Sequence, residues 1–213
     1  MNMTDTIVAL ATAQGVSAIA VVRLSGDDAI AITQKVFKGK NLLQQPSHTI
    51  HLGMLCDDTR MIDEVMVSVF KAPHSFTKEH AVEIACHGSP VIIKEIIKVL
   101  LKHGARLATP GEFTKRAYLN GRFDLAQAEA VADLIHAETD NARQAALNQM
   151  RGGFSSEINR LREALIHFAS LIELELDFGE EDVEFAGRDD LKKLISDIQV
   201  YLQKLIHSFD QGN

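Results

Sequence analysis

The pattern of hydrophobic residues changes near residues 119–122, and this change constrains the fold more than any other feature of the sequence. Up to residue 118, β-rich runs alternate with amphipathic helical patterns, whereas strand patterns vanish beyond residue 123. The β-rich runs cover residues 6–12, 18–24, 49–56, 64–70, 81–86 and 105–108. The sequence therefore predicts an α+β protein, with an α/β domain over residues 1–119 and part of an α-helical bundle over residues 120–213.

Two helices are expected inside the α/β domain. The first follows the capping signal of residues 25–28 (Ser-Gly-Asp-Asp) and ends near Gly39. The second begins at residues 89–90 (Ser-Pro), where the missing N–H of proline costs nothing, and ends at Gly104. Lysines recur every four residues on one face of this second helix and aliphatic residues fill the other face, so we expect a surface helix that lies on a sheet.

The helical domain begins with Asp124 and Gln127, which have the spacing of a capping box. Two longer helices are predicted from apolar residues that alternate spacings of four and three, a pattern typical of a helical bundle. These residues are Phe154, Ile158, Leu161, Leu165, Phe168 and Ile172, then Leu191, Ile195, Ile198, Leu202, Leu205 and Phe209. The acidic segment between them, residues 177–185, is interpreted as a solvated connection, with an ion site as the alternative; it lacks the ligand spacing of a calcium loop.

Composition and charge exclude several classes of protein. No apolar stretch approaches the roughly 18 residues of a membrane span and the N-terminus has no signal pattern, so a cytoplasmic protein without membrane contact is expected. Cys56 and Cys86 have no metal-binding spacing and are expected to be small buried side chains. Residues 1–118 carry 13 Lys and Arg against 11 Asp and Glu, whereas residues 119–213 carry 9 against 18, so any nucleic-acid contact would be local.

Glu83 is the first candidate site residue. In a strand over residues 81–86 it shares one face with Ala81, Ala85 and His87. A carboxylate between two alanines either faces solvent or forms the floor of a hollow that takes a ligand, and the residues alone leave both interpretations open. A metal site shared with His87 is excluded, because four residues along a strand span roughly 13 Å. We expect no metal site and no catalytic residue in this chain.

Basic residues provide the other candidates. Arg23 ends a largely apolar run, so its guanidinium must reach a carboxylate, a ligand or the water at the end of the strand. A second basic group surrounds Phe113, Tyr118 and Phe123. It comprises Arg106, Lys115, Arg116 and Arg122. An anion site and a plain solvated surface are both compatible with this group.

Residues 111–130 combine a turn, part of this basic group, a helix cap and an Ala-rich helix. This stretch resembles the signature of the MnmE (TrmE) family of tRNA-modification GTPases, and further matches occur in family order and at family spacing. They lie at residues 5–9, 23–26, 75–77 and 83–88. The resemblance implies an N-terminal domain similar in fold to the folate-binding domain of aminomethyltransferases, which binds 5-formyltetrahydrofolate at a homodimer interface.

The resemblance also implies which residues bind the folate, namely Arg23, Glu83 and Arg122. The family has lysine at the last position; arginine keeps the charge, but its planar fork changes the contact geometry. The chemistry is reasonable, because a carboxylate accepts the donors on the amino-pyrimidine edge of a pterin and the glutamyl carboxylates of the ligand need cations.

No G-x-x-x-x-G-K-[ST] phosphate loop occurs in the sequence. In the family the GTPase domain, with its GTP, Mg²⁺ and K⁺, follows a segment like residues 191–213. The resemblance thus implies an N-terminal portion that is inactive alone. The full-length protein would act with the flavoprotein MnmG and add an aminomethyl-type group, such as carboxymethylaminomethyl, to C5 of the wobble uridine of tRNA.

Two alternatives to this function stay open. A free-standing folate-dependent aminomethyltransferase would need its own catalytic acid near the folate, and the acidic helical half disfavours it. A dimerisation module with a vestigial pocket would differ in one property, because it would not bind folate.

Overall fold

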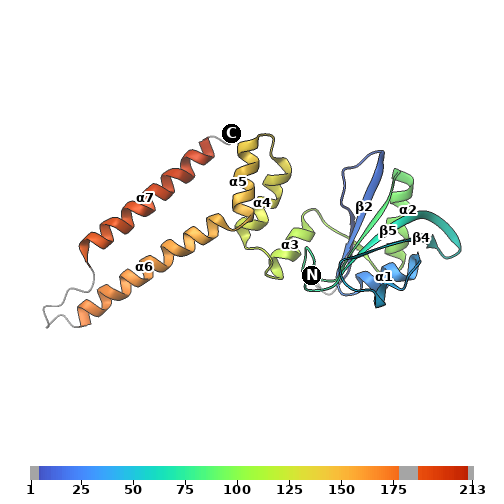
Figure 1. The fold of residues 1–213 in the computed structure, drawn as a ribbon, viewed down its shortest axis with the longest axis horizontal. Coiled ribbons are helices and arrows are strands. Elements are labelled where there is room, and N and C mark those ends of the chain that lie inside the picture. Colours follow the sequence, from blue (N-terminus) through green and yellow to red (C-terminus); the bar gives the residue numbers. More distant parts are fainter. Residues whose placement is uncertain (1–4, 178–186, 211–213) are drawn as a thin grey trace. The chain divides into compact units, whose positions relative to one another are not determined.

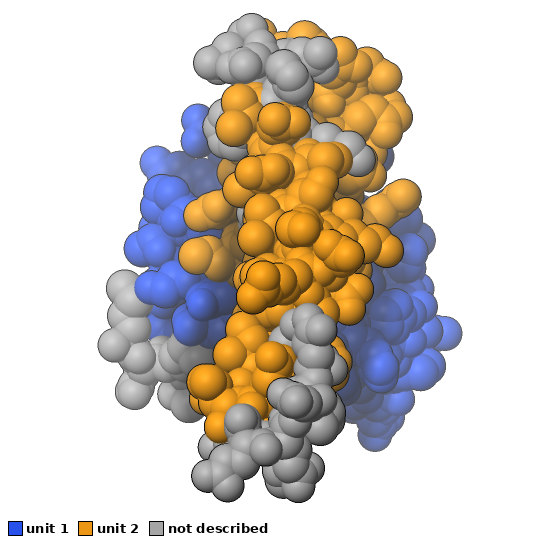
Figure 2. All heavy atoms as spheres, turned by 90° about the vertical axis from the view of Figure 1, so that its left-hand side faces the viewer, with its two compact units in different colours: residues 1–122 blue, residues 123–213 orange. Residues whose placement is uncertain are grey.

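The chain forms two compact units. The computed structural model describes residues 5–177 and 187–210. Contacts divide the chain into unit 1, residues 1–122, and unit 2, residues 123–213, which Figure 2 colours separately. This division falls three residues beyond the boundary expected from the sequence.

Unit 1 is built on a mostly antiparallel sheet. Its described strands are β1 (Ile7–Leu10), β2 (Ser17–Ser25), β3 (Phe37–Lys38), β4 (Thr49–Asp57), β5 (Arg60–Phe70), β6 (Ala81–Gly88) and β7 (Arg106–Leu107). They lie in the order β3-β4-β5-β6-β2-β1-β7, and β1 and β7 pair in parallel. All six predicted β-rich runs correspond to strands. The two-residue β3 was not predicted, because it is too short to show a period.

Helices cover one face of the sheet (Figure 1). They are α1 (Ala29–Val36) and α2 (Pro90–Lys102), with the short 3₁₀ helix η1 (Leu42–Gln44) after β3. Ile96 and Leu100 of α2 pack with Ile84 of β6 in one buried cluster. Both predicted helices are present, but α1 ends at Val36 because the chain turns there into β3.

The face of the sheet opposite α1 and α2 is called here the open face. Its residues alternate with the core residues along each strand. They are Ile19, Val21 and Arg23 of β2, Ile50, Leu52 and Met54 of β4, Glu64, Met66 and Ser68 of β5, and Glu83, Ala85 and His87 of β6. Five of its apolar side chains are between 46% and 66% exposed. Arg23 and Glu83 therefore lie at one end of the open face and Glu64 and His87 at the other, with apolar residues between and beside them.

Both cysteines lie in the α/β unit. Cys56 and Cys86 are buried and unpaired, as predicted. Burial raises the pKa of the Cys86 thiol to about 11. The Cys86 thiol is therefore not activated for nucleophilic chemistry.

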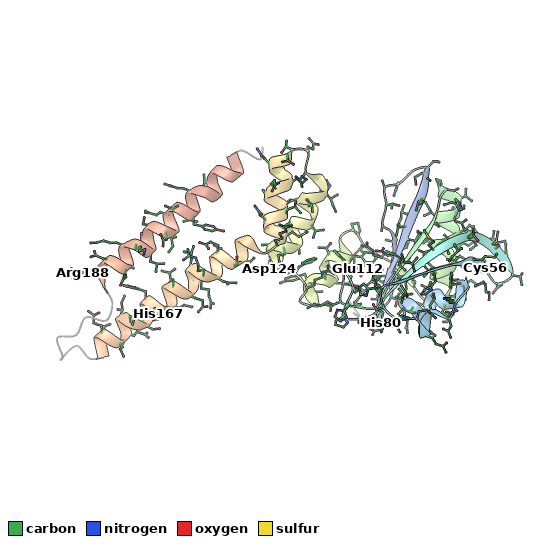
Figure 3. All side chains as sticks on the ribbon, in the orientation of Figure 1. Cys56, His80, Glu112, Asp124, His167 and Arg188 are labelled. Atoms are coloured by element: carbon green, nitrogen blue, oxygen red, sulfur yellow. The ribbon has the colours of Figure 1, made fainter. Side chains whose placement is uncertain are left out.

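Unit 2 is helical throughout its described part. Its helices are α4 (Leu125–His136), α5 (Asp140–Met150), α6 (Gly153–Asp177) and α7 (Arg188–Asp210). The predicted capping box starts α4: the Asp124 carboxylate accepts from the backbone N–H of Gln127 at 2.8 Å, and Gln127 Oε1 accepts from the N–H of Asp124 at 2.9 Å. Figure 3 labels Asp124 at this position.

The predicted apolar positions of α6 and α7 are only partly covered. Leu161 is buried, but others in the same pattern are between 38% and 49% exposed: Ile158, Leu165, Ile172, Ile195 and Leu202. The acidic segment, beyond Asp177, lies outside the described residues. In the part of the chain that is described, no helix has both the length and the apolar character needed to cross a membrane.

Candidate functional site

A pocket of about 530 Å³ opens where β2 ends and β6 begins, at the end of the open face that carries Arg23 and Glu83. Its volume is in the range of small-molecule sites. The lining residues are Arg23, Ser25, His48, Phe70, Pro73, His74, Ser75, Phe76, Thr77, Lys78, Ala81, Glu83, Phe113 and Arg122. The three residues named from the sequence as folate contacts, Arg23, Glu83 and Arg122, all line it.

The pair Arg23 and Glu83 lies on the sheet itself. The two residues are directly opposite each other in the β2–β6 ladder. Arg23 Nε donates to Glu83 Oε1 at 2.9 Å, and Arg23 Nη2 lies 2.7 Å from the same oxygen in an ion pair. The side chains are 29% and 31% exposed, so Glu83 lies in a hollow and does not face open solvent. Because both contacts use Oε1, Glu83 Oε2 is available to accept from a ligand.

Two aromatic rings hold the Arg23 guanidinium. Its Cζ lies 5.6 Å from the ring centre of Phe76 and 5.8 Å from that of Phe113. Arg122 lies 5.1 Å from the Phe76 ring centre and donates from Nη1 to the Ser75 carbonyl. Cation–π contacts of this length are attractive. Phe76 therefore lies next to both arginines.

The pocket loop, residues 71–80, has no helix or strand, but it is tied to its surroundings. The hydroxyls of Thr77 and Ser25 are 2.5 Å apart. Asn120 Nδ2 donates to the Thr77 carbonyl at 2.7 Å, and Lys78 Nζ donates to the Gly121 carbonyl at 2.7 Å. These bonds fix the loop against β2 and against the residues just before unit 2 begins in sequence.

Helix α3 (Glu112–Leu119) carries Phe113 into the pocket and was not predicted from the sequence. A cluster of charges anchors it. Arg116 is 4% exposed and donates to the Asp5 carbonyl at 2.8 Å and to Glu79 Oε1 at 3.2 Å. Glu79 Oε2 in turn accepts from the Ser25 hydroxyl at 2.7 Å. The buried cluster thus reaches the floor of the pocket.

The second half of this cluster joins α3 to β7. Arg106 donates to Glu112 Oε1 at 2.6 Å and to Asp5 Oδ2 at 2.7 Å. Hydrogen bonds from Arg106, opposed by burial, hold the pKa of Glu112 at about 2. The hydrogen bonds to Glu112 and Asp5 in turn raise the pKa of Arg106. Figure 3 labels Glu112.

These contacts correct the interpretation of the basic group. Arg106 and Arg116 do not form an anion site, because carboxylates of the same domain already neutralise them. Arg116 is also buried, so a solvated surface does not describe it, whereas the Arg106 side chain is 40% exposed. Of the four basic residues, Arg122 is the one that lines the pocket. In the residues that the structure describes, no cluster of three or more His, Cys, Asp or Glu side chains could hold a metal ion.

Several lining residues were missed by the sequence reasoning. Phe76 lies in the family-like match at residues 75–77, which was the only signal for it. His48, His74 and Lys78 lie in loops where no period or motif marks them. Their place at the pocket follows from tertiary structure alone.

Comparison with known proteins identifies both parts of the chain. Residues 6–122 match the family described as the GTP-binding protein TrmE N-terminus, and residues 125–213 match the MnmE helical domain. The chain is similar to proteins named tRNA modification GTPase MnmE. That of Cytophaga hutchinsonii is 62% identical over 212 residues, covering 100% of this chain. Those of Bacteroides thetaiotaomicron and Salinibacter ruber are 51% and 49% identical, covering 98% and 100% of this chain.

The chain spans about half the length of these curated relatives, since each match covers 46% of the relative. The two family matches meet within the segment where the contacts divide the chain. The two matched families agree with the expected α+β architecture, in which a domain with a curled sheet is followed by a helical domain. Because the two family models together cover nearly all of the sequence, the chain belongs to the TrmE (MnmE) family.

Proposed function

We propose that this chain is the folate-binding N-terminal portion of a tRNA-modification GTPase, and that its pocket takes 5-formyltetrahydrofolate. The observation that carries the proposal is the half-buried Arg23–Glu83 pair in a pocket with aromatic walls. A pterin has a planar ring with a donor-rich edge. The pocket offers a free carboxylate oxygen for that edge and flat side chains for the ring.

Each residue has a separate task in this arrangement. Glu83 Oε2 accepts hydrogen bonds from the amino-pyrimidine edge of the pterin. Arg23 pairs with the carboxylate and orients it, because its guanidinium is held between Phe76 and Phe113. Arg122 supplies positive charge for the carboxylates of the ligand's glutamate. The pocket binds and orients a one-carbon carrier, and its residues perform no covalent step.

The chemistry of the whole protein is proposed from its relatives. Proteins similar to this chain are named tRNA modification GTPases. We propose that GTP hydrolysis, with Mg²⁺ and K⁺, resides in a part of the protein outside these 213 residues. We further propose that the protein acts in the cytoplasm with MnmG on the wobble uridine of tRNA, adding a carboxymethylaminomethyl-type group at C5.

We also propose that two copies of the chain associate through unit 1. The open face supports this, because its exposed apolar residues are contiguous in the strand ladders with the row that contains Glu83. A two-fold interface repeats each contact, and a ligand that touches both copies tightens association. Sedimentation at micromolar protein is expected to show a dimer, and a monomer with and without folate would contradict the proposal.

Calorimetry with 5-formyltetrahydrofolate tests the central claim. Glu83→Ala is expected to weaken binding by more than about tenfold, because it removes the acceptor of a partly desolvated hydrogen-bonded pair. Glu95→Ala is the matched control, since Glu95 is a surface carboxylate of α2 that pairs with Arg60. Arg122→Lys should retain binding. Equal affinity of Glu83→Ala and the unmodified chain would refute the assignment of the pocket.

A further inference from the structure

We propose that the pocket selects folates with several γ-linked glutamates, and that Lys78 binds the carboxylates beyond the first residue of that tail. The inference rests on the proposed function, which it extends from the head of the ligand to its tail. It follows from burial, charge and backbone conformation at the mouth of the pocket.

Burial orients the ligand. Ser25, Thr77 and Ala81 are buried and form the floor, next to the half-buried Glu83. The exposed lining residues form the mouth. They are His48, Pro73, His74, Lys78 and Arg122. A ligand whose flat, donor-rich head reaches Glu83 must therefore extend its other end past these residues toward solvent.

The mouth is cationic, although the whole chain has a net charge of −7. Glu83 is the one carboxylate among the lining residues, and Arg23 already neutralises it. Arg122 and Lys78 also line the mouth and lie close together, because Lys78 Nζ donates to the carbonyl of the residue before Arg122. Arg122 is engaged by Phe76 and by the Ser75 carbonyl. Each γ-linked glutamate adds one carboxylate, for which the Lys78 ammonium has two further N–H donors.

The backbone at Lys78 is a second, independent observation. Lys78 has φ = 60°, in the left-handed region that favours glycine and asparagine. His48, also at the mouth, has φ = 64°. In the described part of the chain, these are two of three non-glycine residues with positive φ, the third being Asp58. Strained residues of this kind cluster at ligand sites. At residue 78 a lysine occupies this conformation, although glycine or asparagine would adopt it with less strain.

The experiment compares 5-formyltetrahydrofolate with one and with three glutamates, by calorimetry at low salt on the whole chain. We expect the triglutamate to bind about three- to tenfold more tightly, as two added exposed ion pairs allow. About 0.5 M salt should remove this gain, because it screens exposed charges. Lys78→Asn should also remove the gain, and Lys78→Arg should restore it.

Two controls separate the role of the charge from folding. Asparagine tolerates the left-handed conformation, so the Lys78→Asn chain should melt at the same temperature as the unmodified chain or above it. Lys94→Gln removes an exposed charge from α2, which lies on the other face of the sheet, and should leave the triglutamate preference intact.

The affinities of the two ligand forms decide between this inference and its alternatives. Equal affinity for the two forms, or a preference that survives Lys78→Asn, overturns the role of the mouth and leaves the proposed function standing. Absence of binding for both forms overturns the proposed function and this inference with it. A preference that is lost in Lys78→Asn and retained in Lys78→Arg supports both.

Discussion

Apart from β3, η1, α3 and α5, the helices and strands of units 1 and 2 correspond to elements that the sequence predicts, but the two units bury apolar residues to very different extents. In unit 1, side chains such as Leu24, Ile84 and Leu100 have no exposed surface. Among the described side chains of unit 2, the buried hydrophobic residues are Ala130, Ala146 and Leu161. A periodic apolar pattern thus predicts a helix reliably, whereas it does not show that the helix has a partner.

The physical reason lies in the range of the hydrogen bonds. A helix closes its backbone bonds within four residues, so α6 and α7 can form with their apolar faces uncovered. A strand must find its partner elsewhere in the chain, as β2 does with β6 about 60 residues later. Forming the sheet of unit 1 therefore assembles a core, while forming the helices of unit 2 does not.

The largest expected difference is in amide hydrogen exchange. We expect the slowest amides of β2 and β6 to open with a free energy at least about 3 kcal/mol above that of α6 and α7, because local stability follows buried contacts. Mass spectrometry of the isolated chain at several concentrations measures this. Association that covers unit 2 would appear as protection that rises with concentration. High protection of α6 and α7 that is independent of concentration would contradict the comparison.

Paired leucine substitutions should sharpen the same contrast. Leu100→Ala in unit 1 removes a side chain with no exposed surface and should cost about 2–5 kcal/mol of unfolding free energy. Leu165→Ala in unit 2 removes one that is 45% exposed and should cost less than about 1 kcal/mol. Denaturant titration of both variants checks the pair. Similar losses would mean that unit 2 has a core comparable to that of unit 1.

Acid should weaken unit 1 through Glu112. Its pKa falls from an ordinary 4.5 to about 2 on folding, mainly through the hydrogen bond from Arg106. The ionised form is thus favoured by folding, so this stability is present above pH 4.5 and is lost as the pH falls toward 2. Full loss corresponds to about 3 kcal/mol. Unfolding free energies at several pH values between these limits measure it, and Glu112→Gln should flatten the dependence.

The smallest effect concerns the start of unit 2. Asp124→Ala removes the carboxylate of the capping box and should cost about 1 kcal/mol of local stability. Exchange of the amides in the first turn of α4 should accelerate, whereas β2 and β6 should keep their rates. Acceleration throughout unit 1 would show that the two units unfold together.

The elements that the sequence predicted are those held by apolar periodicity or by caps. Helix α3 was not predicted, because ion pairs rather than apolar side chains hold it in place. Its buried residues are Glu112, Arg116 and Ala117. Buried ion pairs leave no hydrophobic period in the sequence. The same pairs explain why the basic group near residue 116 was misjudged, since its carboxylate partners Asp5 and Glu79 are distant in sequence.

The candidate site could be anticipated only in part. The resemblance to the family pointed to Arg23, Glu83 and Arg122, and alternation along the strand placed Glu83 between Ala81 and Ala85. Neither source indicated that Arg23 would pair with Glu83, because strand register depends on the whole sheet. The contributions of Phe76 and Lys78 depend on how the pocket loop folds back onto α3 and Gly121.

The register that joins Arg23 to Glu83 also limits how this protein can evolve. Deleting one residue near the start of β6 would shift the strand by one position and exchange Glu83 with the core residue Ile84. The site and the core would be lost in a single event. Insertions and deletions should therefore be purged from β2 and β6 in any lineage that still uses the pocket.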